Sequence, residues 1–225
     1  MLRVALLALA LIVPACATRQ LTETERAFVD TVHGDTVDLD AVTVVDGAVV
    51  GLIRRTRPPR PQTACRERLF PPETGPITTS FAAFVLDETI HYSTWAHEPD
   101  FLEGYPDELP LRDAMRLAHE LTHVWQWQQR ARTGYHPFKA LTEQTTQADP
   151  YLFELDETRK FLDYGWEQQG IIVEEYVCCR ALDPDGPRTA RLRSVLAEHF
   201  PVLHEERAVN VQLPWDGAET AGICS

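Results

Sequence analysis

The longest amphipathic pattern in the chain lies between residues 111 and 132. Apolar residues recur there three or four positions apart, at Leu111, Met115, Ala118, Leu121 and Trp125. This spacing forms one apolar stripe on an α-helix, and Gly134 follows as a stop signal. We therefore predict a helix over residues 111–132 with one buried face.

Similar patterns predict the remaining elements. We expect helices over residues 166–182 and 188–199, and a short helix within residues 18–32. β-Branched and aromatic residues between 77 and 92 predict strands. Apolar residues 42–45 and 48–50 flank Asp46-Gly47, a dipeptide typical of a two-residue β-hairpin turn. The mixture predicts an α+β fold with a small β-sheet.

Other segments are expected to be irregular. Residues 54–76 contain six Arg and six Pro, which favours a long loop, anchored near Cys65. We interpret the arginines of this loop as solvated rather than as an anion-binding site. An acidic loop should span 93–110. We divide the chain into an N-terminal segment (17–76) with the hairpin and this loop, a single core domain (77–200) and an irregular tail (201–225).

The charge balance narrows the range of partners. The 225 residues include 34 Asp and Glu against 21 Lys and Arg, a net charge of -13. Nucleic acid and anionic lipid surfaces would be repelled, so we expect no nucleic-acid partner and find cationic partners easier to accommodate.

The first residues indicate export. After Arg3, residues 4–13 are all apolar and would form a helix of about 15 Å, half of what a bilayer requires. We interpret residues 1–16 as a signal peptide. Residues 13–16 resemble a bacterial lipobox, in which Cys16 becomes the lipid-anchored first residue in the periplasm or outer membrane. The alternative is cleavage after Ala17 and a secreted, soluble protein.

The other four cysteines are Cys65, Cys178, Cys179 and Cys224. An even number in an exported chain predicts one or two disulfides. Adjacent Cys178 and Cys179 would point about 100° apart on a helix, so each should pair with a distant cysteine, although the connectivity stays open. The chain has no CxxC pair, which argues against a thiolate zinc site.

A candidate metal site lies in the helix predicted over residues 111–132. His119 and His123 are four residues apart and so share one helical face, where both imidazoles can bind one zinc ion. Glu120 is rotated by about 100° and can stand beside the ion as a general base for an attacking water. The alternative is a structural helix with two ordinary histidines.

A catalytic zinc also needs a third protein ligand. Gln126 and Gln129 exclude the longer HExxHxxGxxH motif. Carboxylates on the helix predicted over 166–182 are better candidates, namely Glu167, Glu174 and Glu175. Glu167 and Glu174 would share a face, so one could bind the ion while the other orients a ligand imidazole.

Residues 119–126, HELTHVWQ, resemble zincin-like metallopeptidase domains of poorly known function within the gluzincin group. The resemblance covers residues 77–180 and implies a zincin-like fold with Zn²⁺ as the cofactor. Residues 167–170 are similar to the segment that supplies the third ligand, with Gly170 in place of a small Ala, which implies Glu167. Residues 88–92 resemble the strand that runs along the cleft.

The function indicated is therefore a zinc-dependent hydrolase, a metallopeptidase acting on peptide or protein substrates. The alternative is a lipid-anchored envelope protein that keeps the scaffold for binding or assembly with little or no turnover. Tyr151, Tyr164 and Tyr176 are candidates for stabilising an oxyanion. No spacing selects among them, and we interpret each as a packing residue.

Overall fold

The computed structural model describes residues 18–156, 158–200 and 210–225. The helices are α1 Glu23–His33, α2 Cys65–Arg68, α3 Leu111–Gln128, α4 Arg130–Thr133, α5 Pro137–Thr146, α6 Trp166–Leu182 and α7 Pro187–Leu196. The strands are β1 Thr18–Arg19, β2 Thr43–Asp46, β3 Arg54–Arg57, β4 Ile77–Ser80, β5 Ala83–Leu86, β6 Thr89–Tyr92, β7 Glu108–Pro110 and β8 Asn210–Gln212. The proposed signal peptide and Cys16 lie outside the described residues, and no described helix is both long and apolar enough to cross a membrane.

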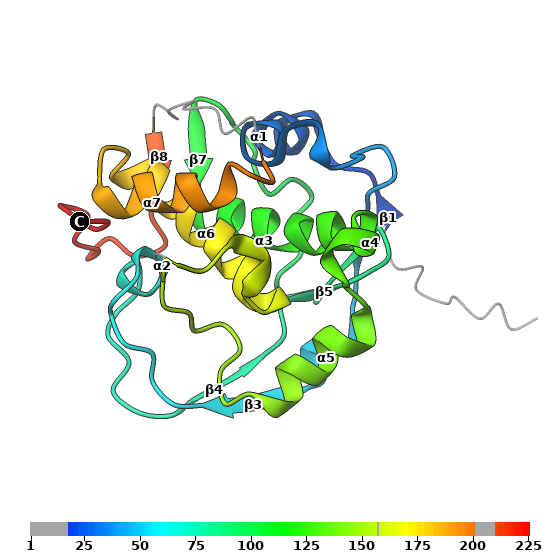
Figure 1. Cartoon of the computed structure of the whole chain (residues 1–225), viewed down its shortest axis with the longest axis horizontal. Helices are drawn as coiled ribbons and strands as arrows, with labels where there is room; N and C mark the ends of the chain where they lie inside the picture. The colour runs from blue at the N-terminus through cyan, green and yellow to red at the C-terminus, as the bar shows by residue number, and fades with distance from the viewer. Residues whose placement is uncertain (1–17, 157, 201–209) are drawn as a thin grey trace, which may run out of the picture.

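The fold is α+β, as the sequence predicts, and its centre is a pair of helices. α3 runs through the middle of the molecule, with α6 packed against one side (Figure 1). A four-stranded sheet in the order β1-β2-β6-β5 packs against α3 through β5 and β6. The two-strand pairs β3-β4 and β7-β8 lie apart from that sheet. This is a zincin-like arrangement, in which the motif helix lies between the sheet and a second helix.

Helix α1 also packs against α3. Thr22 and Glu25 form a capping box at the start of α1, which satisfies backbone N–H groups that the first turn leaves unpaired. At the other end of α1, the buried His33 lies 3.1 Å from the hydroxyl of Thr122 on α3. Because that hydroxyl donates to the carbonyl of Ala118, it accepts from Nε2–H of His33.

The hairpin predicted around Asp46-Gly47 is wrong. β2 pairs antiparallel with β1 and parallel with β6, and the chain then enters a 3-10 turn at Val49–Leu52. A two-residue hairpin turn of this type needs positive φ at both central positions, but only Gly47, at 90°, has it. The glycine lets the chain leave the sheet, and Ala48 N then donates to Tyr92 O at 2.8 Å.

The segment 54–76 is also more ordered than its composition predicts. β3 pairs antiparallel with β4, and α2 begins at Cys65. The arginines are not all solvated either: the side chains of Arg57, Arg60 and Arg66 are only 12%, 17% and 13% exposed. Each is held by a carboxylate, so the loop is built around ion pairs.

Of the one or two disulfides predicted, two are present, and the adjacent cysteines each pair with a distant partner, as expected. Cys65 pairs with Cys178, and Cys179 pairs with Cys224. Both bonds join α6 to other parts of the chain, one to α2 and one to the C-terminal segment. That segment is not wholly irregular, because β8 pairs parallel with β7. The α5 helix was not predicted.

Candidate metal centre

Two imidazoles from α3 converge at the crossing of α3 and α6. The Nε2 atoms of His119 and His123 are 3.1 Å apart, because residues four apart stack on one helical face. Both residues are 5% exposed. Their facing nitrogens can therefore reach a single ion, as the sequence predicts.

The first turn of α6 adds a carboxylate to this pair. Glu167 Oε2 lies 3.4 Å from His119 Nε2, and Oε1 lies 3.5 Å from His123 Nε2. One ligand atom from each of the three residues lies within 4.8 Å of the others. The second candidate, Glu174, approaches the opposite ring nitrogen of His119, and Glu175 instead accepts from the backbone N–H of Cys65.

Gly170 allows the two helices to approach this closely. A Cβ atom at this position would lie 2.7 Å from Cε1 of His119, closer than such contacts ordinarily come. The small residue noted in the sequence is thus required by the imidazole that faces it. Any side chain here would displace either α6 or the ring.

His123 is oriented by an amide that the sequence analysis did not assign to the site. Its Nδ1 lies 2.8 Å from Oε1 of Gln126. The amide nitrogen of Gln126 donates to the carbonyl of Trp166 and to Gln169 Oε1, so its oxygen faces the ring and accepts from Nδ1–H. His123 is thereby held as the tautomer with a free lone pair on Nε2, the form that binds a metal. The i, i+3 spacing on one helical face was the available signal.

His119 has a carboxylate at its other nitrogen. Glu174 Oε1 lies 3.3 Å from Nδ1, and its Oε2 lies 3.4 Å from Nη1 of Arg66. The contact of Glu174 with Nδ1 is an ion pair without hydrogen-bond geometry, and a carboxylate so close to a ligand imidazole raises its basicity. Glu167 has a similar support, because Gln144 on α5 donates to its Oε1 at 2.6 Å.

The charges of the site are strongly coupled. Burial alone would lower the pKa of His119, but Glu167 and Glu174 outweigh burial and raise it to about 10. Burial would raise the pKa of Glu167, yet His123 and His119 hold it far below its usual range. Burial also raises the pKa of Glu120, and the two histidines offset this only in part. A carboxyl group with a raised pKa suits proton transfer near neutral pH.

The donor set fits a zinc ion. Two imidazole nitrogens and a carboxylate are the three protein ligands of many catalytic zinc sites. Here Gln126 fixes one imidazole tautomer and Glu174 backs the other ring. The cluster could therefore hold a metal ion, and its chemistry is consistent with zinc.

Two cavities meet at this cluster, and His119, Glu120 and Tyr151 line both. The larger, of about 310 Å³, is mostly apolar and lies between β5 and α5. Several apolar residues at its wall are exposed, including Leu86, Phe138 and Leu141. The smaller, of about 240 Å³, is rich in arginine. The cluster thus faces two chemically different spaces.

Of the three tyrosines suggested by the sequence, Tyr151 alone lies at the cavities. Its ring centroid is 6.2 Å from that of His119. The Tyr164 hydroxyl binds the backbone at Glu154, and Tyr176 is fully buried in the core. Tyr135, which the sequence did not suggest, stacks 6.0 Å from His123 and lines the apolar cavity.

Among solved structures, the effector domain of VgrG2b from Pseudomonas aeruginosa is similar to this chain, with a TM-score of 0.52 over 81% of this chain and 84% of that domain. The sequence identity is 21%, so the likeness concerns the fold. No family model and no curated protein matches the sequence. The chain therefore shares its fold with an effector domain and carries a buried His-His-Glu cluster on the two central helices.

Proposed function

We propose that the protein is a zinc-dependent metallopeptidase. The observation that carries this proposal is the convergence of His119, His123 and Glu167 on one point, with Glu120 beside them at the junction of two cavities. The histidines would bind zinc through Nε2 and Glu167 through its carboxylate. A bound zinc ion supplies a Lewis acid that polarises a carbonyl oxygen and acidifies a water molecule.

Glu120 is the proposed general base. It follows a ligand on α3 without joining the ligand cluster, and it lines both cavities. Its carboxylate would take a proton from the attacking water and return it to the leaving amine. Burial raises the pKa of Glu120. A carboxyl group with a raised pKa keeps the proton more readily, which supports its delivery to the leaving amine.

Two phenols are available to donate to the developing oxyanion. Burial raises the pKa of both Tyr135 and Tyr151, so each keeps its proton at neutral pH. Preorganised O–H donors of this kind stabilise charge that appears only in the transition state. Tyr151 is the stronger candidate because it lines both cavities.

The apolar cavity supports a peptide as the substrate. It provides space for an apolar side chain next to the scissile bond. β5 forms part of its wall and is an edge strand of the four-stranded sheet, whereas the strand at residues 88–92, which the resemblance implied for the cleft, is paired on both sides. An extended peptide can pair with the free backbone groups of such an edge.

The test is cleavage of a quenched-fluorescent peptide library by the zinc-loaded protein. We expect turnover by wild type and a loss of at least about 100-fold for Glu120→Gln, the lower range for a general base, with unchanged zinc content. Glu103→Gln, at an exposed loop glutamate, is the matched control. No cleavage of any library member by the zinc-loaded wild type would reject the peptidase and leave a binding role for the scaffold.

Export with a lipid anchor at Cys16 is a further part of this proposal. It is supported by the apolar run at residues 4–13 and by two disulfides, which persist in oxidising compartments. Cys16→Ser should release the protein from the membrane fraction or block its processing. A variant that stays membrane-bound at its mature size would contradict the anchor.

A further inference from the structure

The smaller cavity gathers arginines in a protein of net charge -13. Four of them line it, beside His119 and Glu120: Arg57, Arg60, Arg66 and Arg116. The carboxylates that also line it are Glu120 and Glu174. The wall of this cavity is therefore rich in fixed N–H donors.

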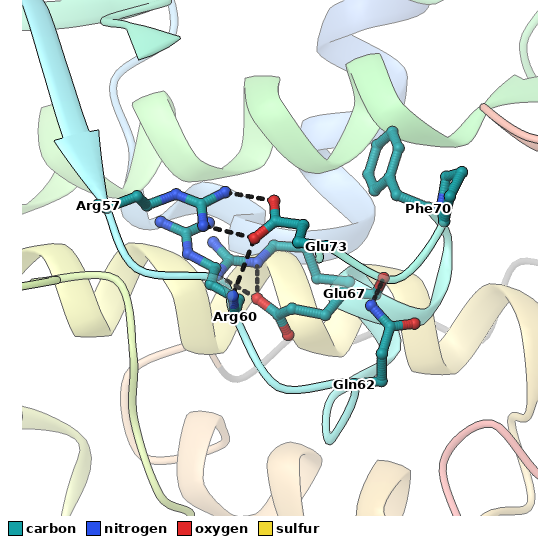
Figure 2. Close-up of a pocket in the computed structure, with 8 residues that line it drawn as sticks. Arg57, Arg60, Gln62, Glu67, Phe70 and Glu73 are labelled. Carbon is teal, nitrogen blue, oxygen red and sulfur yellow. Dashed lines mark hydrogen bonds and ion pairs between the residues drawn. The ribbon is translucent and has the colours of Figure 1, made fainter. Parts of the chain in front are cut away.

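Two of these arginines are committed to holding the fold. Arg57 makes a bidentate pair with Glu73, at 2.7 Å for both bonds (Figure 2). Arg66 binds Glu67 and Glu174, and through Glu174 it supports His119. These guanidinium groups shape the cavity but have little donor capacity left for a ligand.

Arg60 keeps a free donor. Its Nε and Nη2 bind the carboxylate of Asp149 at 2.7 and 3.0 Å, which fixes the plane of the guanidinium. Nη1 has no hydrogen-bond partner among the residues that the structure describes. The guanidinium carbon lies 5.4 Å from the centre of the Tyr151 ring, and Arg60, Tyr151 and His119 line the same cavity.

Arg116 is held even more loosely. It lies on α3 one turn before His119, with its guanidinium 5.8 Å from the centre of the exposed Trp95 ring. Its ion pair with Asp113 and its contact with the carbonyl of Ala96 are both long, at 3.5 Å, and both use Nη1. Nε and Nη2 are left for another acceptor, although the side chain is only 18% exposed.

We infer that this cavity is a carboxylate-binding subsite, in which Arg60 and Arg116 receive an anionic group of the substrate next to the scissile bond. The inference rests on the proposed peptidase function and names its substrate class: a peptide with an apolar residue on one side of the cleaved bond and a carboxylate on the other. The planar guanidinium matches a carboxylate in geometry as well as charge. The carboxylate belongs either to an Asp or Glu side chain or to a free C-terminus.

Binding to the zinc-loaded Glu120→Gln protein tests this without requiring turnover. Three acetylated peptides share a Phe for the apolar cavity. In the first, Glu follows the Phe and the C-terminus is amidated. In the second, Gln follows the Phe and carries the free C-terminal carboxylate. In the third, Gln follows the Phe and the C-terminus is amidated. Calorimetry should show one of the two anionic peptides binding about 10- to 100-fold tighter than the neutral peptide, the range expected for one charge-assisted hydrogen bond. Which of the two it is identifies the source of the carboxylate.

Substitutions then locate the preference. Arg116→Gln should reduce it about tenfold, and Arg60→Lys, which keeps a charge beside Asp149, should reduce it through loss of the fork geometry. Arg112→Gln is the matched control, since Arg112 is on the same helix, half exposed and outside the cavity. Equal binding of all three peptides, or a preference that survives both substitutions because the carboxylate binds the metal, would overturn the subsite. A charge preference in a protein that cleaves nothing would instead reject only the peptidase function.

Discussion

Replacing Gly170 by alanine adds one methyl group at the point where the two central helices meet. The new Cβ would lie 2.7 Å from Cε1, 2.8 Å from Nδ1 and 2.9 Å from Nε2 of His119. Glu167 lies at one nitrogen of the ring and Glu174 at the other, so a shift of the ring away from the new methyl group would break these contacts. We expect the substitution to displace the ring from its position in the cluster.

Two effects of opposite sign determine the size of the change. Alanine favours a helix over glycine by about 1 kcal/mol, whereas overpacking a core costs about 1–3 kcal/mol. The free energy of unfolding of the metal-free protein should therefore fall by no more than about 2 kcal/mol. Zinc affinity should fall about 10- to 100-fold, as when a ligand imidazole loses its orientation.

The assay is competition for zinc against a chromophoric chelator, alongside urea unfolding of the metal-free form. Gly75→Ala is the control, because a Cβ there meets nothing within 4 Å. Wild-type zinc affinity in a correctly folded Gly170→Ala protein would refute the argument. It would mean that His119 is not confined by α6 and that the cluster tolerates a shifted ring.

Three further sets of substitutions test separate parts of the structure. Zinc affinity should fall by much more for Glu167→Ala than for Glu174→Ala, where the expected loss is about 10- to 100-fold. Equal losses would contradict the assignment of Glu167 as the ligand and Glu174 as the residue that supports His119. Burial, with a smaller contribution from Arg180, lowers the pKa of His33 to about 3. As pH drops, His33 is therefore protonated in the unfolded chain before it is protonated in the folded protein. The free energy of unfolding should fall between pH 6.5 and pH 3, by at most about 1.4 kcal/mol per pH unit. Urea midpoints of the metal-free His33→Leu protein should depend less on pH across that window, and parallel curves would refute this. Replacing Cys65 and Cys178 by Ser should lower the free energy of unfolding by about 5 kcal/mol, the chain-entropy value for a loop of this length, and should weaken zinc binding through Arg66. An unchanged urea midpoint would contradict the first effect, and an unchanged zinc affinity would contradict the second.

The sequence predicted the centre of the fold because two helices carry both periodicity and chemistry. The i, i+4 spacing of His119 and His123 is a local property, so their convergence follows from helix geometry. Local similarity pointed to Glu167 over Glu174, and the structure brings Glu167 to the facing nitrogens of the two histidines. The role of each residue stays a prediction until metal content and turnover are measured.

What the sequence missed depends on long-range contacts. Two arginines of residues 54–76 have carboxylate partners far away in the chain, Asp149 for Arg60 and Glu174 for Arg66, and no local pattern reveals such pairs. Gln144 and Tyr135 reach the cluster from α5 and the segment before it, and no local pattern marks either. The predicted hairpin is wrong because residues 48–50 do not return to pair with β2. The partners of β2 are β1 and β6, which no local dipeptide pattern indicates.

The adjacent cysteines on α6 have a practical consequence for anyone who prepares this protein. Four cysteines can pair in three ways, and the observed pairing is Cys65 with Cys178 and Cys179 with Cys224. Exchanging the partners of the two adjacent thiols would require α6 to turn by about 100°, which would carry Glu174 away from His119. A misoxidised isomer would thus keep every ligand residue yet assemble them wrongly, so the zinc content of a preparation should measure how much of it carries the correct disulfides.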